Sequence, residues 1–302
     1  MNPTEKEAAL MHTAIEVSAL TKSYGSHPVL RELTFAVRQG EIFALLGTNG
    51  AGKTTALECI EGLRRPDSGE IRVSGKMGIQ LQSATLPACI KPLEAAELFV
   101  RWHRTRPDRD LLDGLGIGTF SAKLYGQLST GQKRRLHLAL ALTGNPDIVF
   151  LDEPTAGLDV EGRIALHSQI RRLKAQGKTI LLASHDMTEV KALCDRIAIL
   201  SGGSAAFVGT TEELAEKAGK SFTICIKSEQ GEEILRTDDI GAALLLSLED
   251  YRKKAIRITD IQIDRGSLEE DFIRLTKEEK TCAPSSTQQR CSGGSTSAAK
   301  RS

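Results

Sequence analysis

The sequence predicts an α/β fold in which a largely parallel sheet carries helices on its faces. Three strand-like apolar runs, at 148–151, 179–183 and 196–200, are separated by helical patterns, and this alternation is typical of a parallel sheet. The chain has 302 residues, of which 40% are apolar and 26% are charged. That length and composition suit one full-sized core plus a smaller accessory unit.

Short strands are expected ahead of the main sheet. Residues 1–13 read as a flexible polar start, after which Ile15 and Val17 alternate with polar neighbours as in a half-buried strand. A second alternating run covers 33–37 and ends in a turn. The apolar run 41–46 follows directly and predicts a buried strand.

The segment after that buried strand matches the phosphate-binding pattern G-x-x-x-x-G-K-[ST] at every required position. Its residues are Gly47, Thr48, Asn49, Gly50, Ala51, Gly52, Lys53 and Thr54, with Thr55 adjoining. Glycines let backbone N–H groups converge on phosphates at a helix start, Lys53 adds a charge, and Thr54 offers a hydroxyl to magnesium. The helix is expected over 53–63, with Leu63 on its apolar face. The pattern therefore predicts a nucleoside triphosphate site.

Two adjacent carboxylates follow the apolar run 148–151. A buried strand there would deliver Asp152 and Glu153 to the C-terminal edge of the sheet, where ligands of open α/β sheets bind. Asp152 can hold a magnesium ion, directly or through water, and Glu153 can polarise an attacking water as general base. The alternative is a solvated acidic turn, but the Glu153–Pro154 step stops the strand beside the carboxylates.

Charge and hydropathy exclude several classes of protein. Forty basic and 39 acidic residues leave a formal charge of +1, without the basic footprint of a nucleic-acid binder. The longest apolar stretches fall short of the roughly 18 residues of a membrane span, and Glu5 and Glu7 oppose a signal peptide. The six cysteines show no C-x-x-C spacing. We therefore expect a cytoplasmic protein with no nucleic-acid partner, no direct membrane insertion and no zinc site.

A smaller α+β unit is expected near the C-terminus. Thr210 and Glu213 form a capping box for the helix that precedes it. Two strands, a helix and a further strand then follow, at 222–226, 234–235, 242–248 and 256–263. A last helix, capped by Ser267 and Glu270, would present one apolar face. That face consists of Leu268, Phe272 and Leu275.

Three further motifs follow the phosphate-binding loop in sequence order. They are Leu128-Ser129-Thr130-Gly131-Gln132, Ala156-Gly157-Leu158-Asp159 and Ser184-His185-Asp186. Together with the loop and the acidic strand end, they make the chain resemble the ATP-binding-cassette ATPases over about 15–218. The resemblance implies a P-loop cassette fold with a mixed sheet, an antiparallel β piece and a helical signature subdomain. It also implies ATP and Mg²⁺ as cofactors.

The resemblance gives these motifs roles. Ser129, Gly131 and Gln132 of the signature would close over nucleotide held by a second cassette. His185 would contact the γ-phosphate and sense its loss, whereas a histidine without this placement would be read as a surface or core residue. Thr130 departs from the family, which usually has glycine there.

Two positions have rival interpretations. Tyr24 is similar to the aromatic residue that stacks on adenine in this family, and a tyrosine that packs at a strand end is the alternative. Gln82 is similar to the glutamine that joins magnesium to the surface facing the transport partner. Gln80 is a close rival for that role.

The resemblance further implies a domain division and a function. The predicted division is a flexible start (1–13), an ATPase domain (14–220, with the helical subdomain at about 84–130), an accessory domain (221–280) and a disordered tail (281–302). The ATPase would drive a separate membrane permease, and a single loop and signature require a second cassette, as in a homodimer. Segment 261–272 is similar to the closing strand and helix of drug- and antibiotic-exporter ATPases, whose permeases have about six spans.

We therefore expect an exporter subunit bound at the cytoplasmic face of the cell membrane. The alternative is a standalone soluble ATPase, for example one that assists iron–sulfur assembly.

Overall fold

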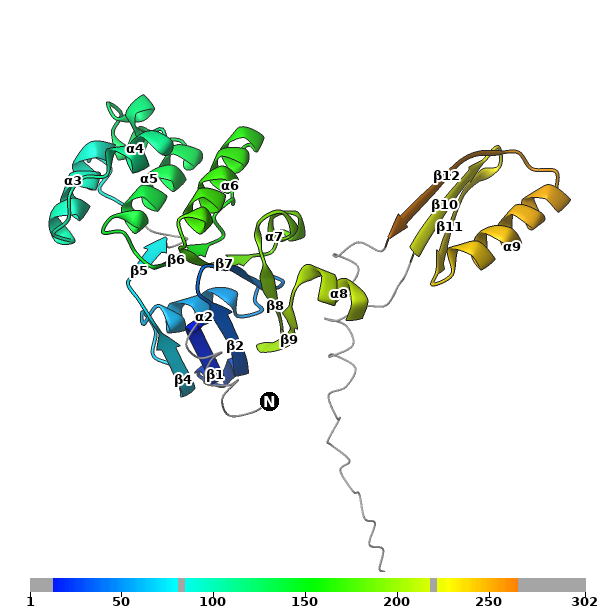
Figure 1. Cartoon of the computed structure of the whole chain (residues 1–302), viewed down its shortest axis with the longest axis horizontal. Coiled ribbons are helices and arrows are strands. Elements are labelled where there is room, and N and C mark those ends of the chain that lie inside the picture. Colours follow the sequence, from blue (N-terminus) through cyan, green and yellow to red (C-terminus); the bar gives the residue numbers. More distant parts are fainter. Residues whose placement is uncertain (1–12, 81–84, 218–221, 266–302) are drawn as a thin grey trace, which may run out of the picture.

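The computed structural model describes residues 13–80, 85–217 and 222–265. Its largest sheet has the strand order β5-β6-β7-β3-β8-β9, and all neighbours are parallel except β8 and β9 (Figure 1). The strands are β3 (Ile42–Leu46), β5 (Met77–Gln80), β6 (Ile148–Asp152), β7 (Thr179–Ser184), β8 (Arg196–Ser201) and β9 (Ser204–Gly209). The predicted mixed α/β sheet is confirmed.

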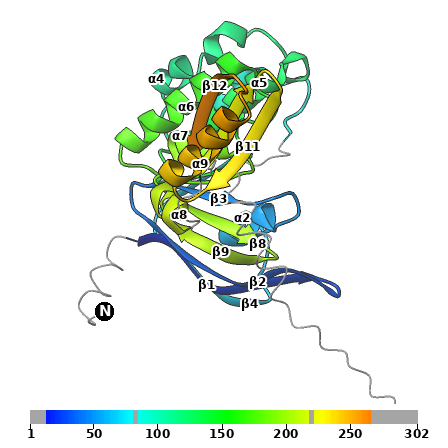
Figure 2. The ribbon, with the colours of Figure 1, turned by 90° about the vertical axis from the view of Figure 1, so that its right-hand side faces the viewer.

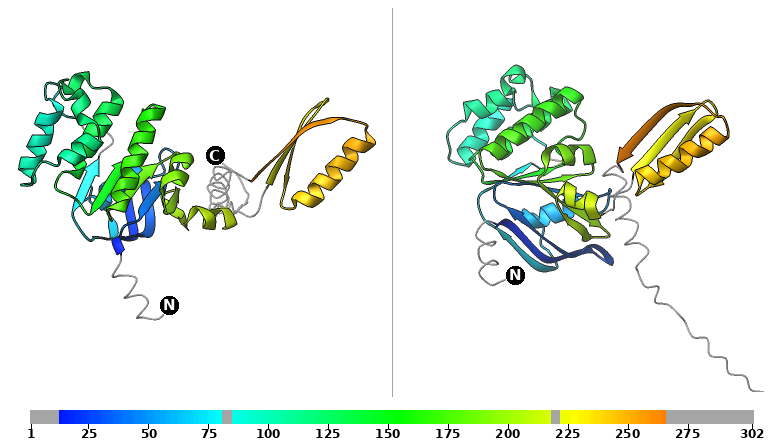
Figure 3. Two further views of the ribbon diagram at one scale, coloured as in Figure 1. Left: turned by 45° about the horizontal axis from the view of Figure 1, so that its top comes forward. Right: turned by 45° about the vertical axis from the view of Figure 1, so that its right-hand side comes forward.

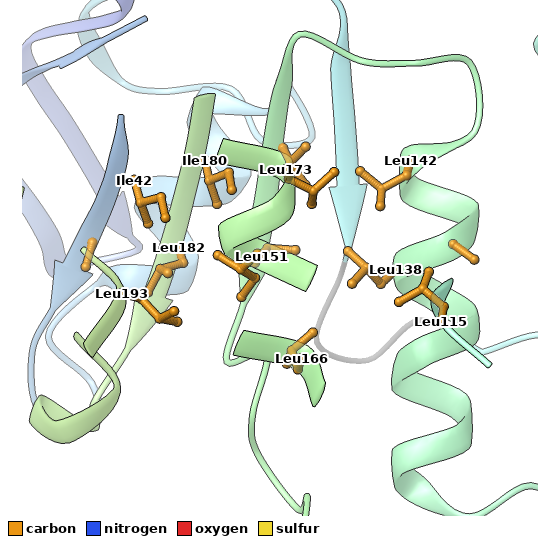
Figure 4. Close-up of a cluster of buried hydrophobic side chains, with 14 of the residues drawn as sticks. Ile42, Leu115, Leu138, Leu142, Leu151, Leu166, Leu173, Ile180, Leu182 and Leu193 are labelled. Carbon is orange, nitrogen blue, oxygen red and sulfur yellow. The ribbon is translucent and has the colours of Figure 1, made fainter. Parts of the chain in front are cut away.

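The inner strands of this sheet are covered on both faces. Every residue of β3, β6 and β7 is buried, which explains why these strands form continuous apolar runs. One face carries α5 (Thr130–Leu142), α6 (Val160–Ala175) and α7 (Met187–Leu193). Figure 4 shows Leu138 and Leu166 of these helices in one cluster with Leu151 and Leu182 of the sheet. The opposite face carries α2 (Lys53–Ile60), whose Leu57 joins a second cluster.

An antiparallel sheet of three strands packs into this second cluster. Its order is β2-β1-β4, with β1 (Thr13–Tyr24), β2 (His27–Arg38) and β4 (Ser68–Val73). The strands expected around Ile15 and over 33–37 are confirmed and extend further than predicted. The extra residues form the hairpin between Lys22 and Leu30, most of which is exposed or half-buried. The apolar alternation that marks a strand is therefore missing there.

The expected end of α2 was wrong. The helix ends at Ile60, and Leu63 lies outside it with 57% of its surface exposed. Gly62 has a φ of +77°, a left-handed conformation that turns the chain out of the helix. The apolar spacing of Leu63 continued the helical period, but the glycine ended the helix first.

Helices and short turns lie between residue 85 and β6. Two short 3₁₀ helices lie between α4 and α5. The elements are α3 (Pro92–Trp102), α4 (Arg109–Gly114), η1 (Ile117–Phe120) and η2 (Tyr125–Gln127). Buried residues of this region, among them Phe120 and Leu136, join the same cluster as the inner strands.

The residues after the main sheet form the expected elements. The Thr210 hydroxyl accepts from the N–H of Glu213 at 3.1 Å, and the Glu213 carboxylate accepts from the N–H of Thr210 at 2.8 Å, so the capping box at α8 (Thr211–Lys217) is confirmed. Three antiparallel strands in the order β11-β10-β12 follow, with α9 beside them (Figures 2 and 3). Their bounds are β10 (Phe222–Ser228), β11 (Gly231–Thr237), α9 (Ile240–Lys253) and β12 (Ile258–Arg265). The helix expected from Ser267 lies outside the described residues.

Candidate active site

The phosphate-binding loop connects β3 to α2. Its shape requires glycine at three places: Gly50 and Gly52 have φ of +83° and +101°, and a Cβ at Gly47 would lie 2.9 Å from the Cβ of Ala51. Thr48 and Asn49 are exposed at the turn, while Ala51 is buried beneath it. The loop therefore opens towards solvent at the start of α2, where free backbone N–H groups favour an anion.

Lys53 crosses beneath this loop. Its side chain is 6% exposed, and its Nζ donates to the carbonyl oxygen of Gly47 at 2.8 Å and lies 3.4 Å from that of Thr48. The same Nζ lies 3.6 Å from Oε1 of Glu153. A buried ammonium between the loop and a carboxylate is therefore fixed at the place where phosphate charge would lie.

The predicted magnesium residues meet beside Lys53. Asp152, at the end of β6, is 5% exposed, and burial raises the pKa of its carboxyl while a hydrogen bond from the Thr54 hydroxyl lowers it. Its Oδ1 is buried and has no hydrogen-bond partner among the described residues. Thr55 is half-buried next to Thr54. A hydroxyl and a carboxylate with an unused oxygen fit a magnesium ion.

Glu153 links Lys53 to the second strand end. Its Oε2 lies 2.8 Å from Nδ1 of His185, which follows β7, while its backbone N–H donates to the carbonyl of Ala183 at 3.0 Å. Glu153 is 9% exposed and has a φ of +48°, so it turns sharply out of β6 towards the phosphate side. The side chain of His185 is 57% exposed and can reach a ligand in solvent.

Of the two candidate glutamines, Gln80 lies among the described residues. Gln82 lies outside the described residues. Gln80, at the end of β5, is 2% exposed, and neither its Oε1 nor its Nε2 has a hydrogen-bond partner among the described residues. A buried amide without a partner, at the end of a strand that pairs with β6, can hydrogen-bond a ligand.

The signature residues form the start of α5. Ser129 is its N-cap: its Oγ accepts from the N–H of Gln132 at 3.2 Å, and the Gln132 side chain accepts from the N–H of Ser129 at 3.1 Å. A Cβ at Gly157 would lie 3.2 Å from Cγ2 of Thr130, and one at Gly131 would lie 3.4 Å from Leu158. The signature therefore contacts the segment after Glu153. It lies on the face of the sheet opposite α2.

Tyr24 is the last residue of β1. It is 42% exposed, and the guanidinium carbon of Arg64 lies 5.1 Å from its ring centroid. One aromatic face is thus occupied by a cation. The exposure leaves the ring available for a base to stack on it.

Sequence reasoning missed two charged groups near Asp152. Arg134 of α5 interacts with both Asp152 and Glu153, and burial lowers its pKa. Glu61, just after α2, is 7% exposed; burial and the nearby Asp152 raise its pKa to about 7. Arg134 comes two residues after the signature, which could have indicated it, whereas Glu61 carries no local signal.

A family model described as "ABC transporter" matches residues 30–156. The daunorubicin resistance ATP-binding protein DrrA3 of Streptomyces coeruleorubidus is 32% identical, over 89% of this chain and 97% of its own length. The chain belongs to the ABC transporter family. Within it, the Nod factor export ATP-binding protein I of Paraburkholderia xenovorans is 33% identical, over 88% of this chain and 98% of its own length.

A solved structure of an ABC transporter subunit has a similar fold. The solved structure of an ATP-binding subunit of an ABC transporter superposes with a TM-score of 0.62 at 27% identity, over 68% of this chain and 93% of that one. As an ATP-binding subunit of the ABC transporter family, the chain binds and hydrolyses ATP. In the parts of the chain described, no helix is long and apolar enough to cross a membrane. The comparisons do not favour a standalone ATPase of iron–sulfur assembly.

Proposed function

We propose that this chain hydrolyses ATP to drive an exporter, bound at the cytoplasmic face of the cell membrane to a permease of about six spans. Two relatives that match over nearly their whole length are named for drug resistance and for Nod factor export, which supports export. The observation that carries the hydrolytic role is the contact series Lys53–Glu153–His185, with separations of 3.6 and 2.8 Å.

The proposed reaction uses each group according to its position. Glu153 accepts a proton from the attacking water, because its carboxylate lies 3.6 Å from Lys53 at the phosphate site. Lys53 and the loop N–H groups of Gly50 and Gly52 stabilise negative charge on the phosphates, and His185 orients the γ-phosphate from solvent.

Bound magnesium would supply positive charge that offsets the charge developing on the phosphates. Thr54 and Asp152 are proposed to hold it. The third ligand would be Gln82 or Gln80, and the buried, unpartnered amide of Gln80 supports the latter. Their oxygen donors suit this cation.

A second copy of the chain is proposed to complete the site. Ser129, Gly131 and Gln132 lie at the start of α5, which packs on the face of the sheet opposite α2. We propose that they contact nucleotide held by the partner, while Tyr24 stacks on adenine.

The domain division at 14–220 and 221–280 is part of this proposal.

The direct test is reconstitution. The full chain carrying an affinity tag would be isolated from membranes, and the copurified permease identified and placed in vesicles with it. We expect Mg²⁺-dependent ATP hydrolysis and outward transport by the wild type, and neither by the Glu153→Gln variant. A reconstituted complex that hydrolyses no ATP would reject the proposal.

A further inference from the structure

A buried carboxylate outside the catalytic pair lies behind the strand end of β7. Glu189, in the first turn of α7, is 2% exposed. Burial raises its pKa, and hydrogen bonds from Ser184 and Thr155 act in the opposite direction. If packing were its only role, an apolar side chain of similar size would serve with less desolvation. Packing alone therefore does not account for a carboxylate at this buried position.

The first contact fixes the backbone around His185. The Ser184 hydroxyl donates to Oε2 of Glu189 at 2.7 Å, and its oxygen accepts from the backbone N–H of Asp186 at 3.1 Å. Ser184 and Asp186 flank His185 on both sides. The Glu189 carboxylate thereby orients the hydroxyl that holds the turn carrying the histidine.

The second contact fixes the backbone that leaves Glu153. The buried Thr155 side chain lies beside the same Glu189 carboxylate and lowers its pKa. Only Pro154, whose φ is fixed by its ring, separates Thr155 from Glu153. The N–H of Ala156 closes this turn on the carbonyl of Glu153 at 3.2 Å.

The same carboxylate also faces α6. Its Oε1 lies 3.7 Å from Nε2 of His167. Glu189 on α7 thus meets groups from the end of β7, the turn after β6 and α6. Of these, the first two carry the members of the catalytic pair.

We propose that Glu189 is a positioning residue that holds Glu153 and His185 at hydrogen-bonding distance, through Thr155 on one side and Ser184 on the other. The inference rests on the roles proposed above for Glu153 and His185. Because a displacement of about 1 Å can slow a reaction by about a hundredfold, loss of this anchor should affect turnover more than binding. Lys53 meets this network at Glu153 but keeps its own hydrogen bond to the carbonyl of Gly47, so ground-state affinity for ATP should persist.

The test compares two buried carboxylates of the full-length protein. Glu189→Gln keeps the size but leaves one acceptor oxygen and places an amide N–H₂ against two hydroxyls. The matched control is Glu41→Gln, since Glu41 is 7% exposed and accepts from the N–H of Arg38 at 2.6 Å, at the opposite end of β3. Steady-state ATPase activity, binding of a fluorescent ATP analogue and thermal midpoint would be measured for both variants.

We expect Glu189→Gln to lower kcat by about tenfold or more while KM and analogue affinity change by less than about twofold. Glu41→Gln should lower the thermal midpoint and keep kcat within about twofold. Ser184→Ala and Thr155→Val should each lower kcat. Adding both to Glu189→Gln should cost no more than about a further twofold, because all three act through one carboxylate.

Two results would overturn the inference. One is a Glu189→Gln protein that is folded at the assay temperature and turns over at the wild-type rate. The other is independent, multiplicative losses in the triple variant. Glu153→Gln and His185→Ala serve as reference variants: wild-type turnover in these would reject the proposed catalytic roles, whereas their loss of activity beside an active Glu189→Gln would reject only the positioning role.

Discussion

Oε2 of Glu153 lies 2.8 Å from Nδ1 of His185, although 32 residues separate them in the chain. The contact exists because β6 and β7 are parallel neighbours whose carboxyl ends meet at one edge of the sheet. Glu153 also lies near Lys53, so the catalytic carboxylate is held between a lysine from one motif and a histidine from another.

Glu153→Gln should separate ATP binding from hydrolysis. The amide cannot accept the proton of the attacking water, so kcat should fall by about a hundredfold or more. Binding should survive, since the phosphate loop is unchanged, and ATP should then trap a dimer. Size-exclusion chromatography with light scattering measures this directly. A variant that stays monomeric at saturating ATP would contradict the proposed pairing.

Lys53→Ala should abolish productive nucleotide binding. The substitution removes a buried ammonium that anchors the loop through Gly47 and that would face phosphate charge. We expect the Kd for ATP to rise by at least about tenfold, or about 1.4 kcal/mol, in a titration calorimeter. Lys254→Ala is the control, because Lys254 pairs with Asp250 on an exposed surface. Unchanged ATPase activity in Lys53→Ala would refute the loop assignment.

Two glycines of the loop should respond differently to alanine. At Gly52, a Cβ would lie 2.8 Å from Cδ2 of Leu30 and 3.1 Å from the carbonyl of Val29, and φ is +101°. At Gly50, φ is +83° but no atom lies within 4 Å. Gly50→Ala should therefore lose about 1 kcal/mol of stability from backbone strain alone, and Gly52→Ala clearly more. Chemical denaturation of the nucleotide-free protein measures both, and equal losses would contradict the steric argument.

Glu61 should make stability depend on pH. Burial, with Asp152 and Glu58 nearby, raises its pKa from 4.5 to about 7, so the folded protein binds the proton more tightly than the unfolded chain does. Its contribution is fully present below about pH 4.5 and is lost as the pH rises towards and through 7. Glu61→Gln should therefore gain stability relative to wild type between pH 5 and about 8. Denaturation without nucleotide or metal would show this gain; a constant difference across that range would contradict it.

Tyr24 should distinguish nucleotides from bare phosphate. If its exposed ring stacks on adenine, Tyr24→Ala should weaken ATP binding by about 1–3 kcal/mol and leave inorganic triphosphate binding unchanged. Tyr24→Phe keeps the ring and should bind ATP within about twofold of wild type. A loss of thermal stability with unaltered ATP affinity would instead support a packing role at the strand end.

The sequence motifs alone determined which groups form the nucleotide site. The glycines and Lys53 of the loop, the Asp152–Glu153 strand end and the capping residues of the signature act over a few neighbouring residues, so their chemistry is visible in the sequence. The buried parallel strands were equally visible, because a strand covered on both faces must be apolar throughout.

Contacts between distant segments were decided only by the tertiary structure. Nothing near Glu189 or Glu61 in the sequence shows that each is buried, because burial depends on the helices and strands packed around it. The end of α2 at Ile60 also depended on the folded backbone: the apolar spacing continued to Leu63, but the left-handed conformation of Gly62 turned the chain out of the helix. Spacing along the chain specifies which groups exist, whereas sheet order brings Lys53, Glu153 and His185 together, since it sets which strand ends are neighbours.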